Sequence, residues 1–316
     1  MRGSSSFVLL LLGCVIAAGC SVQRSGLNPD AASADDLGVA PVDLGVSEVD
    51  GDAPEPDLGV IELDLGVPDL GTRCDPADCS AGRFCDGDAC GYARSCNELT
   101  DAPGGPTVDG VYTLDGDGDG DGGLSPADAY CDLTSEGGGW TLVLKADGEE
   151  DTFRYDSPYW TNSEEFEGGE AMRDTNEAKL RTYLTVEFTQ MRVVMVTGGV
   201  ESAVVLDVGA SSCVELFRRD HTSTRIDREV WLAMVPDSSL QNNCNREGIN
   251  VAPAAHNARV RIGIVGNNEG DCNSPDSRIG IGGAWPNKDI TTGNVARAWA
   301  SRGDRNTVSF GYVFVR

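Results

Sequence analysis

The chain has 316 residues, 51 Asp and Glu against 24 Lys and Arg, and a formal net charge of −27 at pH 7. A negative balance of this size excludes a nucleic-acid partner, because the phosphates would be repelled. With 11 cysteines and an apolar leader, the composition favours an exported chain whose cysteines form disulfides.

The first segment, residues 1–19, is expected to be a signal peptide. A charged start at Arg2 precedes an apolar run, residues 7–18, that is too short to span a bilayer. The small residues before Cys20 resemble a bacterial lipobox, in which this cysteine becomes the lipidated first residue of the mature protein. We therefore expect an outer-membrane or cell-surface lipoprotein that contacts the membrane only through its lipid anchor. An ordinary signal peptide cut near Gly19, which would give a secreted protein, is the alternative.

The next segment, residues 20–72, is expected to be a disordered acidic linker. Lys and Arg are absent between Arg24 and Arg73, and no aromatic residue occurs there. Such a segment cannot bury enough apolar surface to offset the entropy lost on ordering. We interpret it as a spacer that lifts the following domain off a membrane, with an acidic interaction tail as the alternative. The tetrapeptide DLGV recurs in it, at Asp36, Asp43, Asp57 and Asp64.

Residues 73–94 form a cysteine-rich block. Four cysteines in so short a piece of an exported chain predict two disulfides, for which three connectivities are possible. A zinc site is the rival interpretation, since four thiolates can close a tetrahedron, but the block contains no CxxC pair. Of the three connectivities we favour the interlocked one, Cys74 to Cys85 and Cys79 to Cys90.

The sequence YCDLTSEGGGWTLVLK, Tyr130–Lys145, is the most distinctive stretch of the chain. Three consecutive glycines, Gly137 to Gly139, are costly in a strand, because glycine loses the most backbone entropy on folding. We expect them to allow a tight bend beside a buried Trp140, whose indole N–H then needs an acceptor.

This stretch resembles the signature of the fibrinogen C-terminal-like domain, shared by fibrinogen, ficolins, tachylectins and, in variant form, intelectins. SCNEL at Ser95–Leu99, GVYTL at Gly110–Leu114 and the final FGYVFVR match how such domains begin and end. The resemblance covers residues 95–316 and is strongest in their first third. It implies this fold for the globular domain and a disulfide between Cys96 and Cys131.

The rest of the sequence is typical of an α+β domain with a twisted, mostly antiparallel sheet, short helices and long loops. Apolar spacing predicts a helix over Thr175–Leu184, and CVELFRRD predicts another that begins at Cys213. Cys213 is then a candidate buried thiol, whereas Cys244 and Cys272, both in polar sequence, are expected to pair. Strands are predicted at Trp140–Lys145, Arg192–Thr197, Ala203–Val208, Arg259–Val265 and Val308–Val315.

An Asp-Gly repeat between Leu114 and Tyr130 matches a calcium loop of the EF-hand type. Short carboxylates on a glycine-rich loop can wrap a calcium ion, which needs six to eight oxygens. No helix follows, so the loop would join two strands. A solvated turn without an ion is an equally good interpretation. The matching positions are Asp117, Asp119, Asp121 and Asp128.

A second oxygen-rich segment, Gly266–Asp289, follows an apolar strand and precedes a glycine-rich strand. It resembles the calcium and ligand region of the intelectins, with two departures: Asp276 replaces a histidine ligand, and the later glutamate falls near Asn287 or Asp289. The alternative is a polar loop that needs these residues for turn chemistry. The candidate calcium ligands are Asn268, Glu269, Asp271, Asn273 and Asp276, and the candidate ligand-binding residues are Trp285, Asn287 and Asp289.

Enzymatic chemistry is not expected, since neither GxSxG nor HExxH occurs and both histidines, His221 and His256, are expected in exposed loops. Trp160, Trp231 and Trp299 are expected to be packing residues. Our hypothesis is a surface-anchored, calcium-dependent recognition protein that binds an extracellular glycan or a surface protein in a lectin-like way. A calcium-independent adhesion module is the alternative and a glycan hydrolase the third possibility. The oligomeric state is left open.

Overall fold

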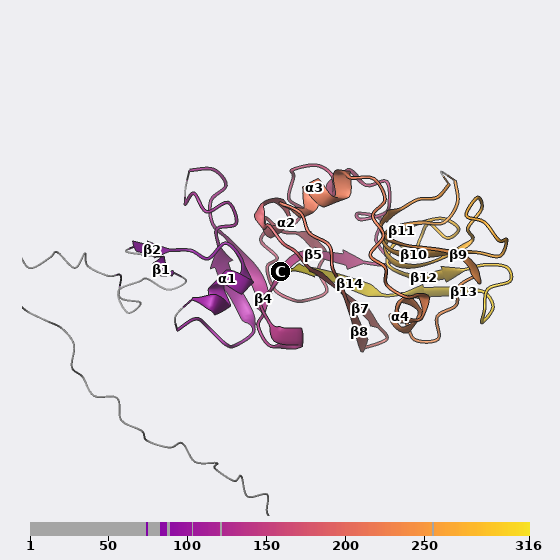
Figure 1. Cartoon of the computed structure of the whole chain (residues 1–316), viewed down its shortest axis with the longest axis horizontal. Coiled ribbons are helices and arrows are strands. Elements are labelled where there is room, and N and C mark those ends of the chain that lie inside the picture. Colours follow the sequence, from indigo (N-terminus) through magenta and orange to yellow (C-terminus); the bar gives the residue numbers. More distant parts are fainter. Residues whose placement is uncertain (1–73, 75–82, 87–88, 103, 121, 255) are drawn as a thin grey trace, which may run out of the picture. The chain divides into compact units, whose positions relative to one another are not determined.

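Apolar strands of the middle and end of the chain build one large antiparallel sheet, ordered β3-β4-β5-β14-β7-β8, with β6 paired to β5 at one end (Figure 1). The computed structural model describes residues 74, 83–86, 89–102, 104–120, 122–254 and 256–316. The predicted signal peptide, Cys20, the acidic linker, Cys79 and Asp121 lie outside these residues. The strands are β3 (Gly110–Leu114), β4 (Ala127–Asp132), β5 (Trp140–Asp147), β6 (Ala178–Lys179), β7 (Met191–Thr197), β8 (Val200–Leu206) and β14 (Phe310–Val315).

The strand β14 lies in the middle of this sheet, antiparallel to β5 on one side and to β7 on the other. Its side chains alternate between two hydrophobic clusters. Val313 and Val315 belong to one cluster, and Phe310, Tyr312 and Phe314 to the other. The final strand therefore joins segments far apart in the sequence and has apolar packing on both faces.

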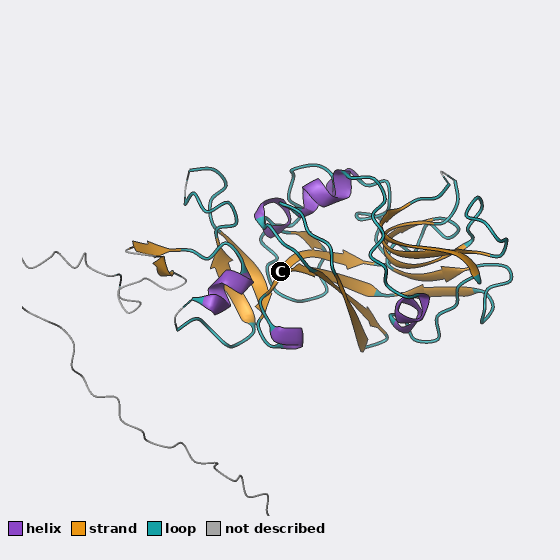
Figure 2. Cartoon of the chain, in the orientation of Figure 1, coloured by secondary structure: helices purple, strands orange, loops and turns teal. Residues whose placement is uncertain are grey.

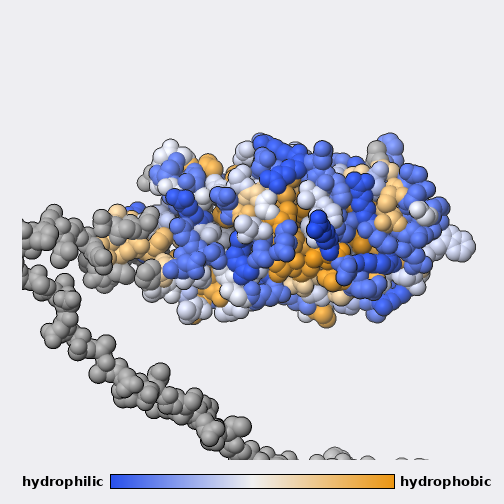
Figure 3. Space-filling view, in the orientation of Figure 1, coloured by the Kyte–Doolittle hydropathy of each residue, from blue (hydrophilic) through white to orange (hydrophobic). Residues whose placement is uncertain are grey.

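The last third of the chain forms a second antiparallel sheet, ordered β13-β12-β11-β10-β9 (Figure 1). Isoleucines from three of its strands share one hydrophobic core with the first sheet, so the two sheets are packed together. Figure 3 shows a mostly hydrophilic surface with a hydrophobic band across the middle of the view. The strands are β9 (Asn243–Val251), β10 (Arg259–Asn267), β11 (Ser277–Ala284), β12 (Gly293–Ala296) and β13 (Arg305–Val308).

The helices are all short and cover the sheets rather than forming a layer of their own (Figure 2). Trp160 and Trp231, from two of them, are fully buried in the shared core, as expected. Strands thus dominate the described residues, and the helical part of the expected α+β fold is small. The helices are α1 (Cys96–Asp101), η2 (Ser135–Gly137), η3 (Pro158–Trp160), α2 (Thr182–Thr185), α3 (Cys213–Arg218) and α4 (Arg228–Ala233), and a small hairpin, β1 (Phe84–Asp86) and β2 (Ala89–Gly91), precedes α1.

The glycine turn before β5 has the structure expected from its sequence. Gly137, Gly138 and Gly139 have φ values of 91°, 72° and 76°, a region that residues with a Cβ rarely adopt. Trp140 is fully buried, and its indole Nε1–H donates to the Ser135 carbonyl at 3.0 Å. The guanidinium of Arg316 lies 4.1 Å from the centre of the Trp140 ring and donates to the Gly138 carbonyl. The turn therefore connects the start of β5 to the end of β14.

The disulfides agree with the sequence analysis where the structure describes both partners. Cys96 pairs with Cys131, Cys244 with Cys272, and Cys74 with Cys85. Cys90 is also disulfide-bonded, and Cys213 is a buried free thiol, as expected. Such pairing suits an oxidising environment, which is compatible with export. Within the described residues, none of the helices has the length and apolar character to cross a membrane.

The prediction of a helix over Thr175–Leu184 was wrong. Ala178 and Lys179 form the strand β6, paired with β5, and only the later residues are helical, as the single turn α2. Lys179 also bridges to Phe166 on its other side, so tertiary pairing overrides the local helical spacing. The strands expected at 203–208 and 308–315 are present with shifted ends.

Candidate functional site

The Asp-Gly loop between β3 and β4 brings three carboxylates together. One oxygen each from Asp115, Asp117 and Asp119 lies within 4.8 Å of the others, the only such group of acidic, His or Cys residues within the described part of the chain. Asp115 is buried, and burial is the largest cause that raises the pKa of its carboxyl group. Asp115 was not among the predicted ligands, because it precedes the first position of the calcium-loop pattern.

Backbone N–H groups already bind these carboxylates. Asp115 accepts from Gly120 N at 2.8 Å, Asp117 from Leu124 N at 3.1 Å and Asp119 from Gly123 N at 3.0 Å. The bond from Leu124 is the first of the causes that lower the pKa of Asp117. These bonds account for the loop conformation without an ion.

Asp128, the ligand predicted at position twelve of that loop, does not belong to this acidic group. It lies on β4 opposite Thr113, whose hydroxyl donates to it at 2.6 Å. Asp115 therefore belongs to the acidic group in place of the expected Asp128. Strand pairing turns the Asp128 side chain toward Thr113.

The loop between β10 and β11, residues 268–276, is organised by a buried glutamine that the sequence analysis did not single out. The Gln241 amide donates to Asn268 Oδ1 at 3.1 Å, and its oxygen accepts from Asp276 N at 3.0 Å. Asn268 in turn donates to Glu269 Oε1 at 2.7 Å. We call Gln241, Asn268, Glu269 and Asp276 the Gln241 cluster. Burial first, and then the charge of Glu269, raise the pKa of Asp276, while the Gln241 hydrogen bond lowers it.

The other two predicted ligands of this loop, Asp271 and Asn273, close a turn beside the cluster. Asp271 Oδ1 accepts from Asn273 N at 2.8 Å, and the Asp271 carbonyl accepts from Asn267 Nδ2 at 2.9 Å. Asn267 is fully buried, and its Oδ1 has no hydrogen-bond donor among the described groups. A buried acceptor without a donor needs a water molecule or a cation. The loop therefore has one buried acceptor oxygen without a donor, at Asn267. Its three predicted carboxylate ligands, Glu269, Asp271 and Asp276, do not converge as the Asp115 group does.

Trp299 is exposed, contrary to its expected packing role, and follows a residue that Gln241 binds. The same Gln241 amide donates to the Ala298 carbonyl at 2.7 Å, and the indole of Trp299 is 81% exposed. Ala298 and Trp299 have φ values of 21° and 64°, which are unusual for residues with a Cβ and are often found at functional sites. Tertiary structure thus brings the backbone of the residue before an exposed tryptophan to the oxygen-rich cluster.

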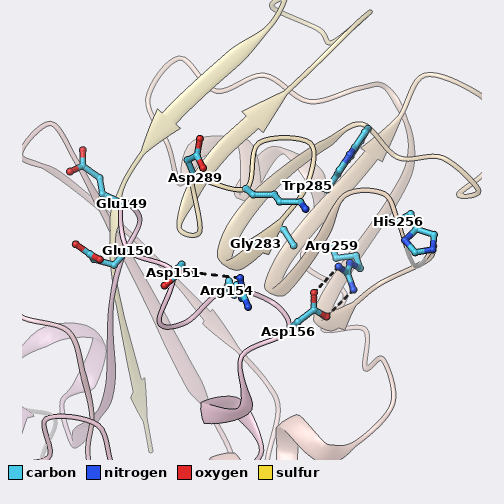
Figure 4. Close-up of a pocket in the computed structure, with 12 residues that line it drawn as sticks. Glu149, Glu150, Asp151, Arg154, Asp156, His256, Arg259, Gly283, Trp285 and Asp289 are labelled. Atoms are coloured by element: carbon cyan, nitrogen blue, oxygen red, sulfur yellow. Dashed lines mark hydrogen bonds and ion pairs between the residues drawn. The ribbon is translucent and has the colours of Figure 1, made fainter.

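The predicted ligand-binding residues lie at the other end of β11. This strand has eight residues, so its ends are about 25 Å apart. Trp285 and Asp289 line a pocket of about 730 Å³ between the loop after β5 and the loop after β11 (Figure 4). Asn287 does not line the pocket. The structure therefore separates the predicted ligand-binding residues from the predicted metal ligands.

Charged groups line this Trp285 pocket, and two ion pairs form among them, Arg154 with Asp151 and Arg259 with Asp156. Arg259 forms two hydrogen bonds with Asp156, at 3.0 and 2.8 Å, as Figure 4 shows. A fully buried arginine, Arg278, donates to the Trp285 and Asn287 carbonyls and so holds the loop after β11 in place. Burial lowers the pKa of Arg278 to about 9.

Two candidate sites result: the Gln241 cluster, which binds the residue before Trp299, and the Trp285 pocket. His221 is half-buried and bonded to the Glu247 carbonyl, and His256 is exposed at the rim of the Trp285 pocket.

Comparison of the chain with models of known protein families gave no match, and comparison with curated protein sequences gave no match either.

Proposed function

We propose that the protein is a surface-anchored, calcium-dependent recognition protein whose residues 95–316 are a fibrinogen C-terminal-like domain. The motif resemblance supports the domain assignment. The contacts among the glycine turn, Trp140 and Arg316 are consistent with it, because they join the two ends of the domain that carry the motifs. Lipidation at Cys20 and the acidic linker would hold this domain away from the membrane surface.

The exposed Trp299, which directly follows the Gln241-bound Ala298, is the observation that carries the proposed function. In calcium-mediated sugar binding the ion takes two vicinal hydroxyls and an aromatic ring packs on the sugar. We therefore assign the ligand surface to Trp299 rather than to Trp285. The ligand class is an extracellular glycan, and a surface protein is the alternative partner.

We assign the calcium ion to the Gln241 cluster. Asn268 Oδ1 and Glu269 Oε1 supply side-chain oxygens there, and Asp276 is bound to Gln241 through its backbone N–H. Asn267, whose Oδ1 has no donor, directly precedes Asn268 in the chain. Calcium accepts such a mixture of carboxylate, amide and water oxygens. The Asp115 group is the second candidate: its three carboxylates lie within 4.8 Å of one another, and backbone N–H groups bind them.

Calorimetric titration of calcium into the purified chain tests the metal assignment. Asp276→Asn is expected to weaken calcium binding at least about tenfold, since it removes one charged ligand. Asp289→Asn, the same change at the other end of β11, is the control and should bind as wild type does. Asp117→Asn reports on the Asp-Gly loop: if it alone abolishes the calcium heat, the assignment to the Gln241 cluster is wrong.

A glycan array with and without a chelator tests the ligand. Trp299→Ala should remove the glycan signal while leaving the calcium heat unchanged. If Trp285→Ala removes the signal and Trp299→Ala does not, the ligand lies in the Trp285 pocket instead. Absence of both calcium heat and glycan signal, with retained binding to cell-surface protein, would favour the calcium-independent adhesion module. Turnover of a glycan that one carboxylate substitution abolishes would favour the hydrolase.

A further inference from the structure

A second pocket, of about 440 Å³, lies at β9 and β10 of the second sheet and is basic although the whole chain is strongly acidic. Three arginines line it from different parts of the chain: Arg219 after α3, Arg246 on β9 and Arg261 on β10. Asp220 is the only acidic residue that lines it. We call it the arginine pocket.

The charges of two of these arginines have no carboxylate partner. Among the described residues, no Asp or Glu oxygen lies within 4.0 Å of the side-chain nitrogens of Arg246 or Arg261. Arg219 has one distant partner, Glu215, at 3.9 Å. Of the three, Arg261 is the one that burial desolvates, and desolvated arginines in proteins are usually paired with an anion. Arg261 and the half-buried Arg246 therefore have unused capacity for one.

Arg261 is held in position by neutral acceptors. Its Nε donates to the Tyr155 carbonyl at 2.8 Å, and its Nη1 donates to Asn250 Oδ1 at 2.7 Å. Its guanidinium also lies 4.5 Å from the centre of the Tyr155 ring. None of these contacts neutralises the charge, and burial lowers the pKa of Arg261. These contacts thus fix the orientation of the guanidinium without supplying a negative charge to it.

Asn250 connects this arginine to the loop that carries Arg219. The Asn250 side chain is buried, and its Nδ2 donates to the Phe217 and Arg219 carbonyls at 3.1 and 2.8 Å. One buried amide therefore fixes the relative positions of two pocket walls. Such a supported arrangement is expected of a binding site more than of a chance gathering of surface arginines.

We propose that the arginine pocket binds a single oxyanion group, a sulfate, phosphate or carboxylate, carried by a small ligand. Guanidinium groups match the geometry of such oxyanions and form paired hydrogen bonds with them. A long polyanion is excluded, because the remaining surface of a chain with a net charge of −27 would repel it. The site is separate from the Gln241 cluster and needs no calcium.

Arginine side-chain NMR of the purified chain, in a chelator and at low chloride, tests the proposal. Inorganic sulfate and inorganic phosphate are titrated separately, and glucose 6-sulfate is compared with glucose. Saturable shifts of the Arg246 and Arg261 Nε–H signals are expected with the oxyanions and not with glucose. Tighter binding of glucose 6-sulfate than of inorganic sulfate identifies a sugar-borne group as the ligand, and equal binding identifies the free anion.

Arg246→Gln should weaken binding at least about tenfold, the usual effect of losing one charge-assisted hydrogen bond. Arg302→Gln makes the same charge change at an exposed position outside the pocket and should alter binding less than about twofold. If Arg246→Gln melts at a lower temperature than wild type, Arg219→Gln at an exposed position replaces it. Shifts that do not saturate, or equal losses in Arg246→Gln and Arg302→Gln, overturn the proposal.

Discussion

The Gly138→Ala substitution in the turn before β5 is expected to be severely destabilising. Gly138 has φ 72° and ψ −170°, a region that is nearly restricted to glycine and costs other residues about 1–3 kcal/mol. A Cβ there would lie 2.2 Å from the Leu133 carbonyl oxygen, a backbone atom that cannot move without shifting the chain. Such overpacking adds about 1–3 kcal/mol. We expect a total loss of about 2–6 kcal/mol, a large part of the stability of an ordinary domain.

Gly199→Ala provides the matched control for this prediction. Gly199, in the turn between β7 and β8, has φ 82°, but no heavy atom lies within 4 Å of the position of its Cβ. Gly199→Ala should therefore lower the free energy of unfolding by only about 1 kcal/mol, the conformational penalty alone. Urea unfolding of the full chain, followed by tryptophan fluorescence, gives both free energies. Equal losses in the two variants would refute the argument that close approach at Leu133 requires Gly138.

Two further predictions concern buried titratable groups. Burial lowers the pKa of Lys179 to about 8, so the folded state loses this proton before the unfolded state does as the pH rises. The free energy of unfolding should therefore rise with pH between 8 and 10.5, by at most about 1.4 kcal/mol per pH unit. This gain in stability should be lost as the pH falls through 8. Lys179→Met should remove this slope in urea unfolding measured at several pH values, and an unchanged slope would contradict the assignment. Burial also raises the pKa of the Cys213 thiol, so a thiol reagent should not label it in the native protein. Denaturant should expose one further reactive thiol that Cys213→Ala lacks, and labelling of native Cys213 would show that the site is accessible.

The sequence alone predicted those features that depend on local chemistry. Strands β5, β7 and β10 follow from runs of β-branched residues, which fit a pleated, half-buried surface. The glycine turn and the acceptor for the Trp140 indole follow from the cost of three glycines and of an unpaired buried N–H. The pairing of Cys244 with Cys272 was predicted because both lie in polar sequence, whereas Cys213 was placed on a helix. Cys244 itself belongs to the strand β9.

The candidate site depended on the tertiary structure, because antiparallel pairing decides which loops share an end of a sheet. Ser277 on β11 pairs with Ala296 on β12, and this places Trp299 near Asp276 although 22 residues separate them in the chain. Trp285, only 8 residues before Gly293, belongs to the opposite end of β11. In the same way Lys179 became a strand residue through pairing with Leu144 and Phe166. Local pattern determined which residues form strands, and strand register, which is a long-range property, determined which side chains meet.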